Sequence, residues 1–327
     1  MVRARVAVGV LRLGVLGLVG ACGAVSFLGV GAAACTSSVT VTPGAVDDDA
    51  SATPDARGPD DVADAGAVDA ADAAAKTCDP TAPVTLWVDE TSGYPSRIYV
   101  PASIGQKKGS FLFDMGSETT FVATPEGSPD NGGDGGAATI GTCTQSYVGR
   151  PYHSEDAHGL PNLGTYGTDQ VLAARDARFD LEAGVLDRFL STTPDPVTAG
   201  WNATALERIN GSLLVRIMLD GVAVRLLVDT GNPDILWLGQ QMKPGDVETE
   251  TADALGNVLK VYQGTVMATI SPGKTETLPV SRMPSFPYLE QRVKDEFGGD
   301  VQGLFGVAAL GSHFAFDTTK MVLLRKP

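Results

Sequence analysis

Basic residues are scarce in this chain, and their scarcity excludes one large class of proteins. The chain has 24 Lys and Arg against 39 Asp and Glu, a formal net charge of −15. A protein that binds nucleic acid needs a basic surface to neutralise phosphates, so this composition excludes that class. The sequence also lacks a phosphate-binding Gly loop, a Ser nucleophile elbow and a Cys with a plausible His partner. Hydride, phosphoryl and acyl-enzyme chemistry therefore have no support.

Long apolar runs are also rare. After Cys35 no run reaches the length that spans a bilayer, so we expect everything downstream to be soluble. Gly and Pro make up about 18% of the 327 residues, below the level typical of low-complexity disorder. With 43% of the residues hydrophobic, much of the chain can fold into a structure with many turns.

The first 35 residues have the pattern of an export signal. Arg3 and Arg5 precede an apolar stretch over residues 13–35, the order of a secretion signal, although the stretch is also long enough for an uncleaved membrane anchor. Small residues precede both Cys22 and Cys35, as in the bacterial lipobox. We expect an exported cell-envelope lipoprotein that meets the membrane through a lipid on Cys35, with Cys22 as the alternative acceptor.

Residues 36–80 predict a disordered tether. They contain ten Asp, only two basic residues and no aromatic residue, so they cannot seed a core and their own charge extends them.

Cys78 and Cys143 remain once the signal is removed. Two thiols in an exported protein usually pair, so we predict a disulfide between them. Neither has a second ligand at zinc-site spacing, and we expect no metal and no cofactor.

From residue 81 the sequence predicts a mostly-β protein. Short apolar segments rich in β-branched and aromatic residues alternate with turn residues, and helical periodicity is convincing only over Tyr288–Phe297. The predicted strands are Arg97–Val100, Phe111–Asp114, Thr120–Ala123, Leu213–Leu219, Val222–Asp229, Ile235–Leu238, Val258–Tyr262, Thr265–Ile270 and Val322–Leu324.

Two sequence landmarks occur twice in the same order. FLFDMGS at residues 111–117 matches LLVDTGN at 226–232, and in each copy an apolar strand leads to an Asp in a turn. Further on, GTYG at 164–167 matches GLFG at 303–306. A short helix-like stretch and a strand ending in Asp follow each of the second pair. Two ordered matches indicate an internal duplication.

With these motifs, residues 85–327 resemble the bilobed aspartic proteases of the pepsin and retropepsin-like superfamily. The signature is the Asp-Thr/Ser-Gly turn, complete at Asp229 and altered at its middle residue after Asp114, with a hydrophobic-hydrophobic-Gly element downstream of each. The resemblance implies an all-β fold of two double-psi β-barrel lobes with a few short helices. We assign residues 81–195 to the first lobe and 196–327 to the second, in a monomer.

The resemblance also implies a catalytic site at the junction of the lobes. Asp114 and Asp229 would share one proton and activate a water against a peptide bond. An isolated Asp at a strand end more often only forms a turn; the duplicated frame favours the catalytic interpretation. The family pattern assigns support of the catalytic turns to Gly116, Ser117, Thr230 and Gly231, and packing behind the turns to Gly167 and Gly306.

Three departures from the family pattern bear on activity. Met115 stands where the family has a Thr or Ser whose hydroxyl braces the opposite turn. Asn232 stands where a small or hydroxylated residue commonly bonds the carboxylate, and residues 127–141 read as a Gly-rich loop in a short first lobe. Candidates for a Tyr on a substrate-covering flap are Tyr147, Tyr152 and Tyr262. We expect an aspartic-type endopeptidase; the alternative is a degenerate relative that binds peptide or cell-envelope material without cutting it.

Overall fold

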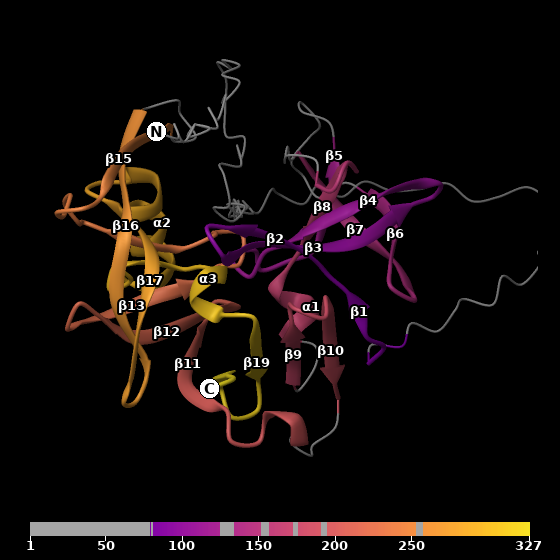
Figure 1. The fold of residues 1–327 in the computed structure, drawn as a ribbon. Helices are drawn as coiled ribbons and strands as arrows, with labels where there is room; N and C mark the ends of the chain where they lie inside the picture. Colours follow the sequence, from indigo (N-terminus) through magenta and orange to yellow (C-terminus); the bar gives the residue numbers. More distant parts are fainter. Residues whose placement is uncertain are drawn as a thin grey trace, which may run out of the picture.

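The computed structural model describes residues 79, 81–124, 134–151, 157–172, 176–190, 195–252 and 258–327. The predicted signal and nearly all of the predicted tether lie outside these ranges. The described part is mostly β-strand with a few short helices, as the sequence predicts. Its strands form two lobes joined by a shared sheet (Figure 1).

The first lobe is built on a seven-stranded sheet. Its order is β2-β3-β4-β8-β5-β7-β6, with an additional pairing of β3 with β6 that curls the sheet toward closure. The strands are β2 (Trp87–Thr91), β3 (Tyr94–Ile104), β4 (Lys107–Phe113), β5 (Phe121–Thr124), β6 (Asp134–Ile140), β7 (Cys143–Pro151) and β8 (Asn162–Tyr166).

The second lobe has the order β12-β13-β18-β14-β17-β16-β15, with an additional pairing of β12 with β16. Its strands are β12 (Ser212–Leu219), β13 (Val222–Val228), β14 (Ile235–Leu238), β15 (Val247–Ala252), β16 (Val258–Ser271), β17 (Lys274–Met283) and β18 (Gly303–Phe305).

The strand pairings repeat between the lobes. In the first lobe β4 runs parallel to β8, β8 antiparallel to β5, and β5 parallel to β7. In the second, β13, β18, β14 and β17 make the same three pairings in the same senses. Even the register agrees, because Phe113 pairs with Tyr166 as Val228 pairs with Phe305. The duplication read from the sequence is thus a duplication of topology.

A third group of strands joins the lobes. Its order is β1-β10-β9-β19-β20-β11, and every pairing is antiparallel. The strands are β1 (Val84–Thr85), β9 (Asp176–Asp180), β10 (Val185–Phe189), β11 (Asn202–Ile209), β19 (His313–Asp317) and β20 (Val322–Arg325). Since β9 follows the first lobe and β19 the second, their pairing fixes the two halves to each other.

The helices are short. They are α1 (Thr168–Leu172), α2 (Pro287–Phe297), α3 (Val307–Leu310) and a 3-10 turn at Pro196–Thr198. Helix α2, predicted from its periodicity, starts with Pro287 and ends at Phe297, and Gly298, with a φ of 81°, forms the left-handed cap. Within the described ranges no helix is long and apolar enough to cross a membrane.

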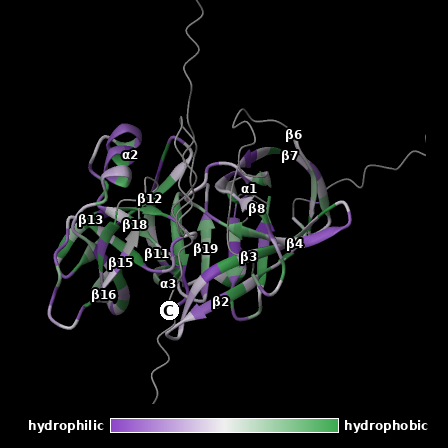
Figure 2. Ribbon diagram, turned by 90° about the horizontal axis from the view of Figure 1, so that it is seen from above, coloured by the Kyte–Doolittle hydropathy of each residue, from purple (hydrophilic) through white to green (hydrophobic). Residues whose placement is uncertain are grey.

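The largest core is continuous between the lobes. Phe111 and Phe113 from the first lobe and Val228 and Phe305 from the second belong to one buried cluster. Apolar residues concentrate on the strands of both halves (Figure 2). The stacked rings of Phe179 and Phe314, with centroids 4.4 Å apart, extend this cluster across the β9–β19 junction.

Two sequence predictions at glycines were wrong. Residues 134–140, read as part of a Gly-rich loop, form strand β6, because Gly135 lets β6 approach β7 where a Cβ would lie 2.8 Å from the Gly149 Cα. Similarly, the two segments read on either side of Gly264 are one strand, β16. At Gly264 a Cβ would lie on the carboxylate of Asp246. Glycine here permits close packing rather than a turn.

Candidate active site

The structure brings Asp114 and Asp229 together. Asp114 follows β4 and Asp229 follows β13, and their backbone N–H groups donate to Tyr166 O (3.0 Å) and Phe305 O (3.1 Å) of the paired strands. Their carboxyl groups hydrogen-bond to each other. Both residues are buried, with exposed fractions of 4% and 1%. The duplicated strands therefore deliver two carboxyl groups to one point between the lobes.

Gly116 and Gly231 hold these carboxyl groups from equivalent positions. The N–H of Gly116 donates to Asp114 Oδ1 at 2.8 Å, and the N–H of Gly231 donates to Asp229 Oδ1 at 2.9 Å. A Cβ at Gly116 would lie 2.7 Å from Asp229 Cγ and 3.0 Å from Asp114 Oδ1. Only glycine lets the first turn approach both carboxyl groups.

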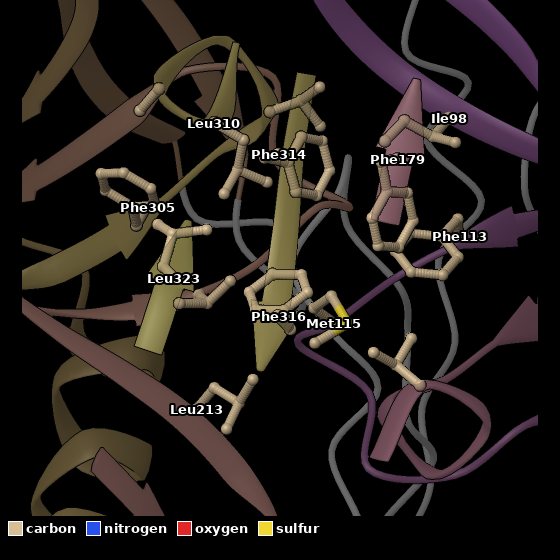
Figure 3. Packing of buried hydrophobic residues seen from close by; sticks show 14 of the residues in the cluster. Ile98, Phe113, Met115, Phe179, Leu213, Phe305, Leu310, Phe314, Phe316 and Leu323 are labelled. Atoms are coloured by element: carbon tan, nitrogen blue, oxygen red, sulfur yellow. The ribbon is translucent and has the colours of Figure 1, made fainter. Parts of the chain in front are cut away.

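Thr230 makes two hydrogen bonds to the first-lobe turn. Its hydroxyl accepts the N–H of Met115 and donates to the carbonyl oxygen of Phe113, each at 2.9 Å. The reciprocal side-chain brace is missing, because Met115 has no hydroxyl. The Met115 side chain is fully buried in the main core, where it lies beside Phe316 (Figure 3). The first-lobe turn is thus held both by the Thr230 hydroxyl and by the apolar packing of Met115.

Ser117 and Asn232 make other bonds than the family pattern implies. The single proton of the Ser117 hydroxyl goes to the carbonyl oxygen of Thr119 at 2.9 Å, so it is not donated to a carboxylate. The Asn232 side-chain amide donates to the carbonyl oxygen of Asp234 at 2.5 Å. Both residues stabilise the turns that follow the pair.

Gly167 and Gly306 lie against the backbone that follows each turn. A Cβ at Gly167 would lie 2.5 Å from the carbonyl carbon of Thr119, and one at Gly306 would lie 2.1 Å from the carbonyl oxygen of Asp234. The helices that begin after them close the arrangement, since the N–H groups of Thr168 and Val307 donate to the carbonyls of Ser117 and Asn232. These bonds measure 2.9 and 3.0 Å.

Burial is the largest influence on the ionisation of the pair. It raises the pKa of Asp114 and raises that of Asp229 well above its ordinary value. The charge of Asp114 raises the pKa of Asp229 further, because two adjacent carboxylates in a low dielectric repel each other. Two carboxyl groups that influence each other in this way titrate as a coupled pair. Such a pair can act as base and acid in the same step.

Two site features were missed at the sequence level. Thr168 donates its hydroxyl to the carbonyl oxygens of Met115 and Ser117, at 2.8 and 2.9 Å. Arg292, on α2, extends toward the first-lobe turn, where its Nη2 lies 3.5 Å from the carbonyl oxygen of Gly116. The signal for Arg292 was its i,i+4 spacing from Glu296, but that spacing does not show which turn the side chain reaches.

The described flap candidates are packed residues. Tyr147 is 9% exposed, packs against Phe111 and accepts a bond from Gln145, and Tyr262 is 8% exposed. Tyr152 lies outside the described residues. These contacts show core side chains at the two described positions.

Cys143 is disulfide-bonded, and its sulfur lies 3.6 Å from the carbonyl oxygen of Asp79. Asp79 adjoins Cys78, which lies outside the described residues, as do Cys22 and Cys35, so the predicted pairing and lipidation stay predictions. Among the described residues no group of three or more His, Cys, Asp or Glu gathers in a way that could hold a metal ion.

Comparison with known proteins gives similarity of fold only. No family model matches the chain, and no curated protein matches it. The solved aspartic proteinase from Irpex lacteus aligns at a TM-score of 0.43 and 13% identity, over 75% of this chain and 97% of that one. Basic 7S globulin from soybean aligns at a TM-score of 0.40 and 9% identity, over 74% and 93%. The duplicated pairings and turns themselves define a two-lobed, aspartic-protease-like all-β fold.

Proposed function

We propose that this protein is an aspartic-type endopeptidase that hydrolyses peptide bonds with a water activated by Asp114 and Asp229. The observation that carries the proposal is the buried, mutually hydrogen-bonded carboxyl pair, held symmetrically by the N–H groups of Gly116 and Gly231. A carboxylate in the pair accepts a proton from the water while its protonated partner donates one to the scissile carbonyl oxygen. These residues need no metal or cofactor for that step.

The ionisation of the pair implies a pH range for the reaction. Activity requires one proton on the pair, so it is lost when both carboxyl groups are protonated and again when both ionise. Because burial raises both pKa values, double ionisation is displaced to higher pH. We therefore expect an activity maximum in acid that extends toward neutral pH.

The test is hydrolysis of a denatured protein mixture from acidic to neutral pH. Asp114→Asn and Asp229→Asn should each reduce the rate by about 10²–10⁴-fold, the usual contribution of a general acid or base. Asp295→Asn, at an exposed position on α2, is the matched control and should keep the wild-type rate. Equal activity in all four proteins would refute the assignment.

One observation favours a second function. With Met115 buried in the core, one of the two side-chain braces is absent. A pair misplaced by about 1 Å can lose a hundredfold in rate. The alternative is therefore a protein that binds peptide or cell-envelope material without cutting it. A folded protein that retains peptide on a column but shows no hydrolysis at any pH would support this alternative.

We also propose that the folded part is held at the cell envelope by a lipid on Cys35, or on Cys22, through the acidic tether. The basic start, the apolar stretch and the two lipobox-like cysteines support this. A clickable fatty acid should label the wild-type protein, and Cys35→Ser or Cys22→Ser should abolish labelling according to which is the acceptor. Labelling of neither cysteine would refute the proposal.

A further inference from the structure

Helix α2 carries a buried cation to the catalytic turn of the opposite lobe. The side chain of Arg292 is 8% exposed, and its Nε donates to Glu296 Oε1 at 3.0 Å. Its Nη2 lies 3.5 Å from the carbonyl oxygen of Gly116. A guanidinium removed from water is costly unless acceptors and opposite charges surround it. The burial of Arg292 beside Gly116 therefore implies that negative charges nearby stabilise its guanidinium.

The guanidinium acts on both members of the carboxyl pair. Burial, the largest influence, raises the pKa of Asp114 and of Asp229, and the positive charge of Arg292 opposes it at both. Because the two carboxyl groups share a proton, a cation that attracts both stabilises the form of the pair that carries one negative charge. Arg292 thus supplies a counter-charge that the duplicated motif itself does not contain.

Other charged groups face Arg292 from two elements. On α2 these are Glu296 and Tyr288. Across from the helix they are Glu118, just past the first-lobe turn, and the carboxyl pair, to which each lobe contributes one Asp. The pKa of Glu118 is raised, by burial first and then by the charge of Glu296, and Arg292 and Arg150 oppose the rise. The guanidinium of Arg292 therefore lies among four carboxyl groups, and Glu296 partly offsets its charge.

The position of Arg292 complements the missing hydroxyl brace. The first-lobe turn is already tied to the second lobe through the N–H of Met115, which donates to Thr230. The next residue, Gly116, receives the side chain of Arg292 from α2, also in the second lobe. Two consecutive residues of the turn thus contact the second lobe, although the side chain of Met115 cannot bond there.

We propose that Arg292 is a positioning residue that holds the first-lobe turn against the second lobe and stabilises the singly ionised carboxyl pair. This inference rests on the proposed function, because it assigns a role at the same pair. It also has consequences in the absence of substrate, since the ionisation of the pair can be measured directly. Its failure and the failure of the proposed peptidase are therefore separable.

The experiment is a carbon-13 NMR titration of the full chain labelled at its Asp carboxyl carbons. Asp114→Asn and Asp229→Asn identify the signals of the pair. Arg292→Gln should raise the apparent pKa values of the pair by about one unit or more, the usual effect of losing an adjacent opposite charge. Arg292→Lys keeps the charge and should stay near the wild-type values.

Two further variants separate charge from structure. Lys294→Gln removes the same charge from an exposed position on the same helix and should leave the titration unchanged. Glu296→Gln removes a negative charge beside Arg292 and should lower the pKa values of the pair, the opposite sign. This variant keeps the inference testable even where Arg292→Gln does not fold.

Unchanged titration in Arg292→Gln, or the same shift in Arg292→Lys and Arg292→Gln, would overturn the inference. So would shifts of the same sign in Arg292→Gln and Glu296→Gln. If the protein cuts peptides, the alkaline limb of its pH–rate profile should move upward in Arg292→Gln by the shift seen in the titration. If it is inert but the titration behaves as expected, the inference stands and the peptidase proposal fails.

Discussion

Replacing Thr230 by Val should weaken the junction of the lobes at its centre. The Thr230 hydroxyl is fully buried and holds the Met115 N–H and the Phe113 carbonyl, each at 2.9 Å. Val keeps the shape of the side chain but leaves both backbone groups without this partner. A buried polar group without a partner costs roughly 1–3 kcal/mol, so we expect the free energy of unfolding to fall by about 2–4 kcal/mol.

Urea denaturation followed by tryptophan fluorescence measures this change, with an unchanged m-value as the sign that the unfolded state is not altered. Thr230→Ser is the matched control, because it keeps the hydroxyl and loses one methyl group, at a cost of about 1 kcal/mol. Met115→Leu changes only the side-chain shape on the opposite turn and leaves the backbone N–H that Thr230 accepts, so it should cost less than about 1.5 kcal/mol.

The stabilities of Thr230→Val and Thr230→Ser, relative to the wild type and to each other, decide the outcome. If Thr230→Val is as stable as the wild type, or if Thr230→Ser is the less stable of the two, the hydroxyl does not brace the lobes. The assignment of Thr230 as turn support would then have to be withdrawn, while the geometry of the carboxyl pair would remain.

Three further predictions concern Met115, Asp234 and the cysteines. Met115→Thr should raise any peptidase rate, because it restores a hydroxyl, and should lower the free energy of unfolding by about 2–4 kcal/mol, because core packing is lost. Rate measurements and urea denaturation of the same variant check the two effects, and a variant that is neither faster nor less stable would contradict both reasons. Burial raises the pKa of Asp234 to about 6, although the hydrogen bond that the Ser281 hydroxyl donates to its carboxylate acts to lower the pKa. Its protonated form therefore favours folding, and the stability it gives is complete below pH 3.8 and lost as pH rises to about 6. Asp234→Asn should remove up to about 3 kcal/mol of this decline in urea titrations between pH 4 and 7; a variant with the same decline would show that another group titrates. Mass mapping without reduction should link the peptides of Cys78 and Cys143, closing a loop of about 65 residues worth roughly 4 kcal/mol, and free alkylation of both thiols would exclude the bridge.

The fold could be predicted from the sequence because its motifs are short, local and repeated. An apolar strand that ends in an Asp turn, followed downstream by a Gly-bounded apolar pair, occurs twice, and those residues form the paired strands and turns of both lobes. The sites of Gly167 and Gly306 were predictable for the same reason. Glycine is needed at both positions because a side chain would clash with the neighbouring backbone, and this requirement recurs in each copy.

The features that the sequence did not predict depend on contacts between residues that are not neighbours in the sequence. Glycine is ambiguous without them, so the residues of β6 read as a loop although Gly135 serves close strand packing. Arg292 contacts a residue 176 positions away, and no periodicity in α2 carries that information. Similarly, the family pattern gave Ser117 a role in turn support but not a bonding partner, and its hydroxyl donates to the carbonyl oxygen of Thr119, two residues on.

The pairing of β9 with β19 has a consequence for how the chain is made. The two strands are about 130 residues apart, so β9 emerges from the ribosome long before its neighbour exists. Until then β9 is an open edge, with unpaired backbone groups that invite pairing with other chains. The antiparallel partner that ends this exposure comes only with His313–Asp317. A chain stalled before residue 313 should therefore aggregate or bind chaperones, even with its first lobe fully formed.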